Sequence, residues 1–229
     1  MLAEITFLGA SRNVTGSCYL LETSNARVLV DCGLYQERKY QDRNWHPFPF
    51  STETIDAVFL THAHLDHCGL LPKLVRDGYE GKVYCTQATA EIAQIILLDA
   101  AHLQEEDAVY KAERHRREGR RGPHPELPLY NAKDAEAVVP HFAAVEYGSC
   151  IRVKDGIEGC FYDAGHVLGS ATIAIDIAKD GEQRSILFSG DIGEPDRPII
   201  NDPAIFDEAD YIVMESTYGD RNQLRSISK

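Results

Sequence analysis

The segment Thr61-His-Ala-His-Leu-Asp-His67 is the feature that most constrains what this chain can fold into. Three imidazoles and one carboxylate fall within six residues, and polar groups of this kind are costly to bury without partners. Neutral imidazole is the commonest nitrogen ligand of zinc, and carboxylate oxygen also suits this metal. The segment follows an apolar run at residues 57–60, so it leaves the end of a predicted strand, where α/β proteins tend to build their sites. The sequence therefore predicts a metal site that contains His62, His64, Asp66 and His67.

A hydrolytic metal site is rarely closed by one loop, and two later segments have the right context to complete it. His166 follows a predicted strand at residues 159–162, and Asp191 follows another at residues 185–188. Glycines beside both residues let the backbone turn sharply and leave room for a metal and a substrate. Taken together with the histidine segment, these features predict that His166 and Asp191 are metal ligands.

The rest of the chain reads as an α/β or α+β protein without a clear domain boundary. Short runs rich in apolar and β-branched residues predict strands, and the continuous apolar runs 28–30 and 57–60 predict strands covered on both faces. The expected strands are residues 5–8, 18–21, 27–31, 57–60, 159–162, 172–177, 185–188 and 211–214. The expected helices are residues 70–77, a long helix from Thr86 or Thr89 towards residue 117, and residues 132–139.

The long predicted helix has an apolar stripe and a basic end. The apolar residues at helical spacing are Ile92, Ile95, Ile96 and Leu103. Residues 111–121 are rich in Lys and Arg, which allows two interpretations. The segment either approaches an RNA backbone or, as we slightly favour, is a solvated helix end stabilised by the helix dipole.

Composition and charge exclude several classes of protein. Of the 229 residues, 44% are hydrophobic, which is enough for a core and excludes a disordered chain or a small disulfide-stapled protein. The formal net charge of −13 excludes a uniformly basic surface for nucleic acid, although not a local basic patch. No apolar run approaches the roughly 18 residues of a membrane-spanning helix, and no signal peptide is evident, so we expect a cytoplasmic protein without membrane association. The six cysteines form no Cys-x-x-Cys pair and are expected to be reduced thiols.

Four segments together resemble the metallo-β-lactamase superfamily and, within it, the β-CASP branch, which contains RNA-processing nucleases. These segments are residues 9–17, 61–67, 165–171 and 215–221, with Asp31 upstream of the histidine segment. The resemblance covers essentially the whole chain. It implies an α/β fold, a metallo-β-lactamase-like αββα sandwich, in which residues 1–229 form one catalytic domain that is incomplete at its C-terminus.

The resemblance also implies two zinc ions and a role for each site residue. The first ion would be held by His62, His64 and His166, the second by Asp66 and His67, and both by Asp191 as a bridge. Asp31 would order the ligand loops from outside the metal shell, since such outer partners fix imidazole orientation. Glu215 matches an acidic residue near the catalytic metals, so Asp66, Glu215 and Asp31 are the expected catalytic residues. The oxygen-rich second position can also accept Mn²⁺ or Fe.

The implied reaction is metal-dependent hydrolysis of RNA phosphodiesters, which would make the chain a ribonuclease in RNA processing with RNA as its partner. Two alternatives remain, namely a small-molecule thioesterase or lactonase that uses the same site, and a non-catalytic partner subunit. The segments at residues 9–17 and 215–221 argue against the first alternative, and the complete set of ligands argues against the second. The sequence leaves a homo-oligomer open.

The pattern of the β-CASP branch continues beyond the end of this chain. After the segment that begins at Glu215, members of the branch insert a cap domain and then complete the lactamase fold with two later histidines. One of these histidines is a metal ligand, and the other is a candidate acid for the leaving group. We therefore expect this chain to be the N-terminal catalytic region of a longer protein, with a weaker second metal site.

Overall fold

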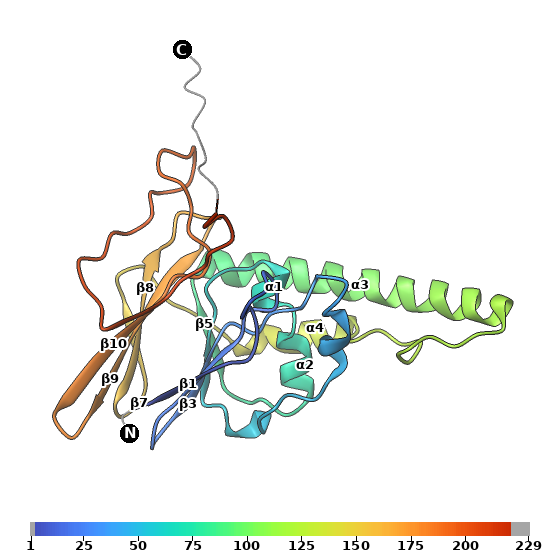
Figure 1. Cartoon of the computed structure of the whole chain (residues 1–229), viewed down its shortest axis with the longest axis horizontal. Coiled ribbons are helices and arrows are strands. Elements are labelled where there is room, and N and C mark those ends of the chain that lie inside the picture. Colours follow the sequence, from blue (N-terminus) through green and yellow to red (C-terminus); the bar gives the residue numbers. More distant parts are fainter. Residues whose placement is uncertain (1–2, 221–229) are drawn as a thin grey trace, which may run out of the picture.

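Two β-sheets pack face to face in the computed structural model, and helices cover the outer face of the first sheet (Figure 1). The structure describes residues 3–220, so Arg221 of the last motif lies outside the described residues. Among the helices in this part of the chain, none lies on the outer face of the second sheet (Figure 1). The predicted fold class is confirmed, with one helical layer and both sheets of the sandwich in place.

The first sheet has six strands in the order β1-β2-β3-β4-β5-β6. They are Glu4–Phe7 (β1), Tyr19–Glu22 (β2), Arg27–Val30 (β3), Ala57–Phe59 (β4), Lys82–Cys85 (β5) and Phe142–Ala144 (β6). Pairing is antiparallel from β1 to β3 and parallel from β3 to β6. Because β3 and β4 are parallel, Asp31 and the histidine segment leave the sheet at the same edge.

The second sheet brings the two later ligand segments to that edge. Its strands, in the order β11-β10-β9-β8-β7, are Tyr211–Val213 (β11), Glu182–Phe188 (β10), Ala171–Lys179 (β9), Ile157–Asp163 (β8) and Cys150–Lys154 (β7). Both β8 and β10 pair antiparallel with β9, so both end on the same side of the sheet, where His166 and Asp191 follow. The backbone N–H of Ala171, at the start of β9, donates to the Thr61 carbonyl at 2.8 Å and joins this side to the histidine segment.

Strand β4 and the residue after it show why the layers pack as they do. Ala57, Val58, Phe59 and Leu60 are all fully buried. Val58 and Leu60 belong to the core beneath the helices, whereas Ala57 and Phe59 belong to the core between the sheets. Successive side chains of a strand point to opposite faces, so a continuous apolar run requires cover on both sides. The prediction of a strand covered on both faces is confirmed.

The helices are Leu65–Cys68 (α1), Leu71–Arg76 (α2), Gln87–Glu118 (α3) and Ala132–Val138 (α4), with three short 3-10 turns at Gln41–Trp45, Thr52–Thr54 and Val139–His141. The long helix α3 begins at Thr86, whose hydroxyl accepts a hydrogen bond from the Thr89 N–H at 3.2 Å. It ends at Gly119, which has the left-handed φ of 64° that glycine adopts without strain. No helix within residues 3–220 combines the length and the apolar character needed to cross a membrane.

The apolar stripe of α3 is not the face that the helix buries most fully, and Ile92 and Ile96 on this stripe are only half-buried. Ile95 and Leu103 are exposed, and the buried face is formed mainly by Ala93, Leu97 and Ala101. Both sets of residues recur at helical spacing, so periodicity alone does not choose between them. Leu97 and small alanine side chains are the residues of α3 that are buried against the helices and the strand beside it.

Three basic residues of the segment 111–121 form ion pairs with carboxylates of α3. Arg114 Nε and Arg120 Nε lie 3.0 Å and 2.5 Å from the Glu118 carboxylate, and Lys111 Nζ lies 2.5 Å from Asp107. These pairs are exposed and contribute little to stability. They favour the interpretation of this segment as a solvated helix end.

The expectation of reduced thiols is wrong for one pair, because Cys150 and Cys160 form a disulfide. Strands β7 and β8 pair in an antiparallel register that sets Cys150 directly opposite Cys160. Strands β5, β6 and β7 were not predicted, and without β7 the sequence could not show this pairing. The remaining cysteines, Cys18, Cys32, Cys68 and Cys85, are free and buried.

The core between the sheets yields a test of the fold. Phe59→Ala should lower the free energy of unfolding by about 3–5 kcal/mol, because it removes a fully buried ring and leaves a cavity. Urea denaturation followed by circular dichroism measures this loss. Phe7→Ala is the matched control, since the Phe7 side chain is 52% exposed and its loss should cost less than about 1 kcal/mol. Equal losses in the two variants would contradict the core described here.

Candidate metal centre

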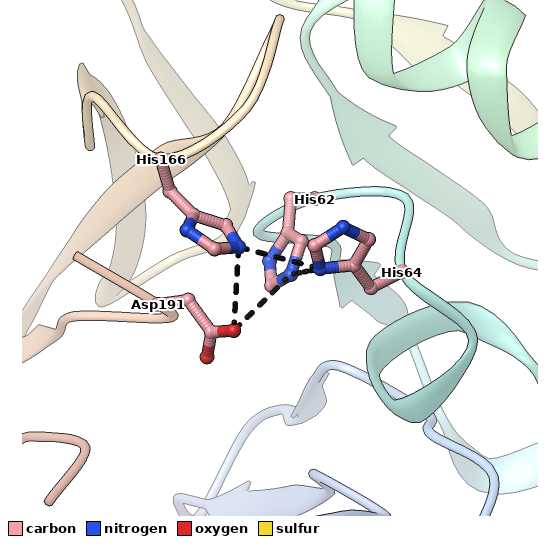
Figure 2. A group of neighbouring side chains, drawn as sticks. All are labelled: His62, His64, His166 and Asp191. Atoms are coloured by element: carbon pink, nitrogen blue, oxygen red, sulfur yellow. Dashed lines mark hydrogen bonds and ion pairs between the residues drawn. The ribbon is translucent and has the colours of Figure 1, made fainter. Parts of the chain in front are cut away.

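Four side chains from three segments point toward one another at the edge where both sheets end (Figure 2). His62 Nε2 lies 3.0 Å from His64 Nδ1 and 3.7 Å from Asp191 Oδ2. His166 Nε2 lies 3.3 Å from His64 Nδ1 and 3.4 Å from Asp191 Oδ2. The structure therefore brings together the ligands predicted for the first metal, although His64 and His166 are 102 residues apart in the chain.

The spacing of these four donor atoms fits a tetrahedral metal ion. Metal–ligand bonds of about 2.0–2.2 Å, as in zinc sites, place tetrahedral neighbours about 3.3–3.6 Å apart. The observed separations run from 3.0 to 3.7 Å, and all four donor atoms lie within 4.8 Å of one another. The donor set of three imidazoles and one carboxylate therefore fits a divalent ion in both chemistry and size. We call these four side chains the first donor group.

A second donor group, formed by Asp66, His67 and Asp191, lies next to the first. The Asp191 Oδ1 atom lies 3.2 Å from His67 Nε2, and Asp66 Oδ2 lies 3.9 Å from the same nitrogen. Asp191 therefore turns one carboxylate oxygen toward each donor group, as a bridging ligand would. With three protein donors instead of four, we expect the second group to bind a metal more weakly.

The histidine segment is a loop only as far as His64, because Leu65–Cys68 forms the short helix α1. This helix is tied to the first sheet, since the backbone N–H of Ser17 donates to the Asp66 carbonyl at 2.8 Å. A Cβ atom on Gly33 would lie 1.7 Å from the same carbonyl oxygen. Glycine is therefore required at position 33 for the chain after β3 to approach the metal-binding segment so closely.

Asp31 contacts the ring nitrogen of His67 that is not directed at Asp191. The Asp31 carboxylate is 1% exposed and accepts hydrogen bonds from the Thr61 N–H at 2.8 Å and from the Thr61 hydroxyl at 2.9 Å. His67 Nδ1 lies 2.8 Å from Asp31 Oδ2, which makes Nδ1 the protonated nitrogen and leaves Nε2 directed at Asp191. This geometry supports the orienting role predicted for Asp31. The sequence analysis assigned no role to Thr61, although its position directly before His62 could have indicated one.

The electrostatics of the centre suit the binding of cations. Burial, followed by the neighbouring histidines, holds the pKa of His62 well below its ordinary value, so the ring is neutral and has a free lone pair. Burial also lowers the pKa of His67, but Asp31 and Asp191 outweigh it and raise this pKa to about 10. Burial raises the pKa of Asp66, whereas the contact with His67 outweighs burial and lowers the pKa of Asp191. The carboxylates thus stabilise a positive charge at the second donor group.

Glu215 lies beside the centre without belonging to either donor group. Its Oε1 atom accepts a hydrogen bond from the Ile192 N–H at 2.7 Å, and its own N–H donates to Ser189 Oγ at 3.1 Å. These bonds anchor the turn that carries Asp191. Glu215 also lines a cavity with His67 and Asp191. Its catalytic role stays a prediction, while the hydrogen bonds show a positioning contact.

Glycines allow the turns of His166 and Asp191 to approach each other closely. The Gly193 N–H donates to the Ala164 carbonyl at 2.9 Å. A Cβ atom on Gly193 would lie 1.6 Å from the carbonyl oxygen of Gly165, so only glycine permits this approach.

A family model described as the metallo-beta-lactamase superfamily matches residues 12–145. The chain belongs to the metallo-β-lactamase superfamily. A solved metallo-β-lactamase of Cronobacter sakazakii, a mutant of its HARLDQ motif, shares the fold with a TM-score of 0.50. It is 19% identical, and the match covers 88% of this chain and 67% of that chain. Membership of the superfamily together with the His/Asp donor group implies a divalent metal ion.

Two curated relatives are named as a ribonuclease and a transcription termination factor. Ribonuclease TTHA0252 of Thermus thermophilus is 39% identical over 95% of this chain and 44% of its own length. Transcription termination factor FttA of Methanocaldococcus jannaschii is 34% identical over 94% of this chain and 31% of its own length. The chain therefore spans less than half the length of these relatives. The resemblance to the superfamily is confirmed.

Metal content provides the direct test of the first donor group. Protein purified without chelator should contain about one to two equivalents of metal, since the first group has four donors and the second has three. His62→Ala should reduce this content to well below one equivalent, as measured by inductively coupled plasma mass spectrometry. His102→Ala is the matched control, because His102 is an exposed residue of α3. A folded wild-type chain without metal, or equal losses in both variants, would show that the donor groups are wrongly assigned.

Proposed function

We propose that this chain is the catalytic region of a β-CASP ribonuclease that hydrolyses RNA phosphodiesters with two zinc ions. The observation that carries the proposal is the position of Asp191, whose two oxygens face separate donor groups. Paired metals about 3.5–4 Å apart act on phosphodiesters by clamping the attacking and leaving oxygens. The named ribonuclease among the relatives supports RNA as the substrate.

The residues of the two donor groups and their neighbours would have separate roles in metal binding and hydrolysis. His62, His64 and His166 would hold the first ion, Asp66 and His67 would hold the second, and Asp191 would contribute to both. When bound, the ions supply Lewis-acid polarisation of the phosphoryl oxygen and lower the pKa of a water molecule. Asp31 keeps the proton on His67 Nδ1, so that Nε2 is free to act as a ligand. Asp66 accepts a hydrogen bond from the attacking water and orients it toward phosphorus.

Zinc is the metal we propose for the first donor group, because three imidazoles and one carboxylate at tetrahedral spacing suit it. The second group is richer in oxygen and also suits Mn²⁺ or Fe. The cap domain, the homo-oligomeric state, the cytoplasmic location and the extent of the catalytic domain over residues 1–229 stay predictions from the sequence.

Removal of Asp66 tests the mechanism. Asp66→Ala should leave the chain folded and reduce hydrolysis of bis-p-nitrophenyl phosphate by about 10²–10⁴-fold, the range for loss of a positioned proton acceptor. The release of p-nitrophenolate measures the rate, and circular dichroism checks the fold. His102→Ala should retain the wild-type rate. Similar losses in Asp66→Ala and His102→Ala would refute the assignment of the site.

Substrate class separates the proposal from the alternatives. The zinc-loaded chain should hydrolyse the phosphodiester faster than p-nitrophenyl thioesters or homoserine lactones, and chelation with EDTA should abolish the activity. Faster hydrolysis of the thioester or the lactone would favour the small-molecule hydrolase. A chain that binds two metals and hydrolyses none of these compounds would favour the non-catalytic subunit.

A further inference from the structure

A cavity of about 300 Å³ opens beside the second donor group. His67 and Asp191 line it on one side, and Glu215 lines it from the segment after β11. The loop after β1 contributes Ala10, Arg12, Asn13 and Val14. The carboxylates of Asp31, Asp191 and Glu215 all belong to its lining. Of the described residues around this cavity, only Arg12 is a lysine or an arginine.

The guanidinium of Arg12 is available to a ligand. The Arg12 side chain is exposed, and within residues 3–220 no carboxylate lies within ion-pair distance of it. Arg27 and Arg114, by contrast, contact the carboxylates of Glu22 and Glu118. An unpaired guanidinium beside an acidic cavity has the geometry and charge to bind a phosphate through two parallel hydrogen bonds.

The loop that carries Arg12 is held in place by exposed and half-buried hydrogen bonds. The Glu37 carboxylate accepts hydrogen bonds from the Val14 N–H at 2.9 Å and from the Thr15 hydroxyl. Burial raises the pKa of Glu37, but these hydrogen bonds outweigh it and lower the pKa, so the carboxylate stays charged. The Tyr35 hydroxyl donates to the Leu8 carbonyl at 2.9 Å and fixes the start of the loop.

The same loop has a strained backbone and is bonded to the metal-binding segment. Ala10 and Arg12 have φ values of 49° and 64°, a left-handed conformation that residues with a side chain seldom adopt. Such strain persists only where the surroundings hold it, and it gathers at functional sites. The loop ends at Ser17, whose N–H donates to the Asp66 carbonyl at 2.8 Å. Arg12 is therefore held in a defined place relative to the second donor group.

We infer that Arg12 binds a phosphate of the RNA strand next to the phosphate that is hydrolysed. This inference rests on the proposed ribonuclease function. A strand that crosses the centre brings several phosphates beside the carboxylates of Asp191 and Glu215, which repel them. The two ions would neutralise the reacting phosphate, and Arg12 neutralises its neighbour. Arg12 thereby selects a polyanionic strand over a neutral ester and sets its position on the metals.

Binding of a short RNA tests this role. The probe is a fluorescein-labelled single-stranded RNA octamer with phosphorothioate linkages, which slow its hydrolysis, and the readout is fluorescence anisotropy with the zinc-loaded full chain. Arg12→Ala should weaken binding about tenfold at low salt, the size expected for the loss of one charge-assisted contact. The slope of log affinity against log salt should fall in magnitude by about 0.7, because one phosphate contact is lost.

Two matched variants separate charge from structure. Arg12→Lys keeps the positive charge and should retain the wild-type salt slope, although it loses the paired hydrogen bonds. Arg184→Ala removes an exposed arginine near the start of β10, far along the strand from Asp191, and should change neither affinity nor slope. If Arg12→Ala also lowers the thermal unfolding midpoint, the salt slope of Arg12→Lys provides the test. A salt slope for Arg12→Lys that equals the reduced slope of Arg12→Ala would overturn the inference.

The outcomes distinguish this inference from the proposed function. Binding of the octamer by Arg12→Ala with wild-type affinity and slope would refute the role of Arg12 and leave the ribonuclease proposal intact. A zinc-loaded wild-type chain that does not bind the octamer would refute RNA as the substrate, and the role of Arg12 with it. A loss confined to Arg12→Ala, with the slope retained in Arg12→Lys, is the result we expect.

Discussion

The buried carboxylate of Asp31 is the group on which the arrangement of the metal centre depends. A carboxylate that is 1% exposed is stable only if hydrogen bonds replace its water, and Thr61 and His67 provide them. These bonds join the end of β3 to the segment after β4, and they direct His67 Nε2 at Asp191. Asp191 then faces His62 and His166 with its other oxygen. The left-handed backbone of Asp31, with φ of 60°, is the conformational cost of this position.

The two sheets explain how residues so distant in the chain reach one another. The core around Phe59 holds the sheets face to face, and the direction of the strands brings the ends of β4, β8 and β10 to one side. Backbone contacts then join Ala171 to Thr61, and Gly193 to the turn of His166. The donor groups are therefore consequences of strand order, and the core that stabilises the fold also sets the spacing of the ligands.

Much of the centre could be predicted because its signals are local in the sequence. A buried strand followed at once by several histidines predicts both a strand end and a metal, and His166 and Asp191 have the same context of a strand followed by glycine-rich turns. The disulfide between Cys150 and Cys160 could not be predicted in this way, because it depends on the register of β7 and β8. The buried face of α3 could not be predicted either, because two stripes share the helical period and only tertiary packing chooses between them. Arg12 was likewise beyond sequence reasoning, since its significance comes from a cavity formed by segments distant in the chain.

The central claim is that Asp191 joins two metal positions, and anomalous diffraction tests it most directly. Crystals of the chain grown with zinc and measured at the zinc absorption edge should show two peaks about 3.5–4 Å apart, one on each side of the Asp191 carboxylate. The peak in the first donor group should lie about 2.0–2.2 Å from the donor atoms of His62, His64 and His166. A single peak away from these histidines, or two peaks of which neither contacts Asp191, would contradict the account.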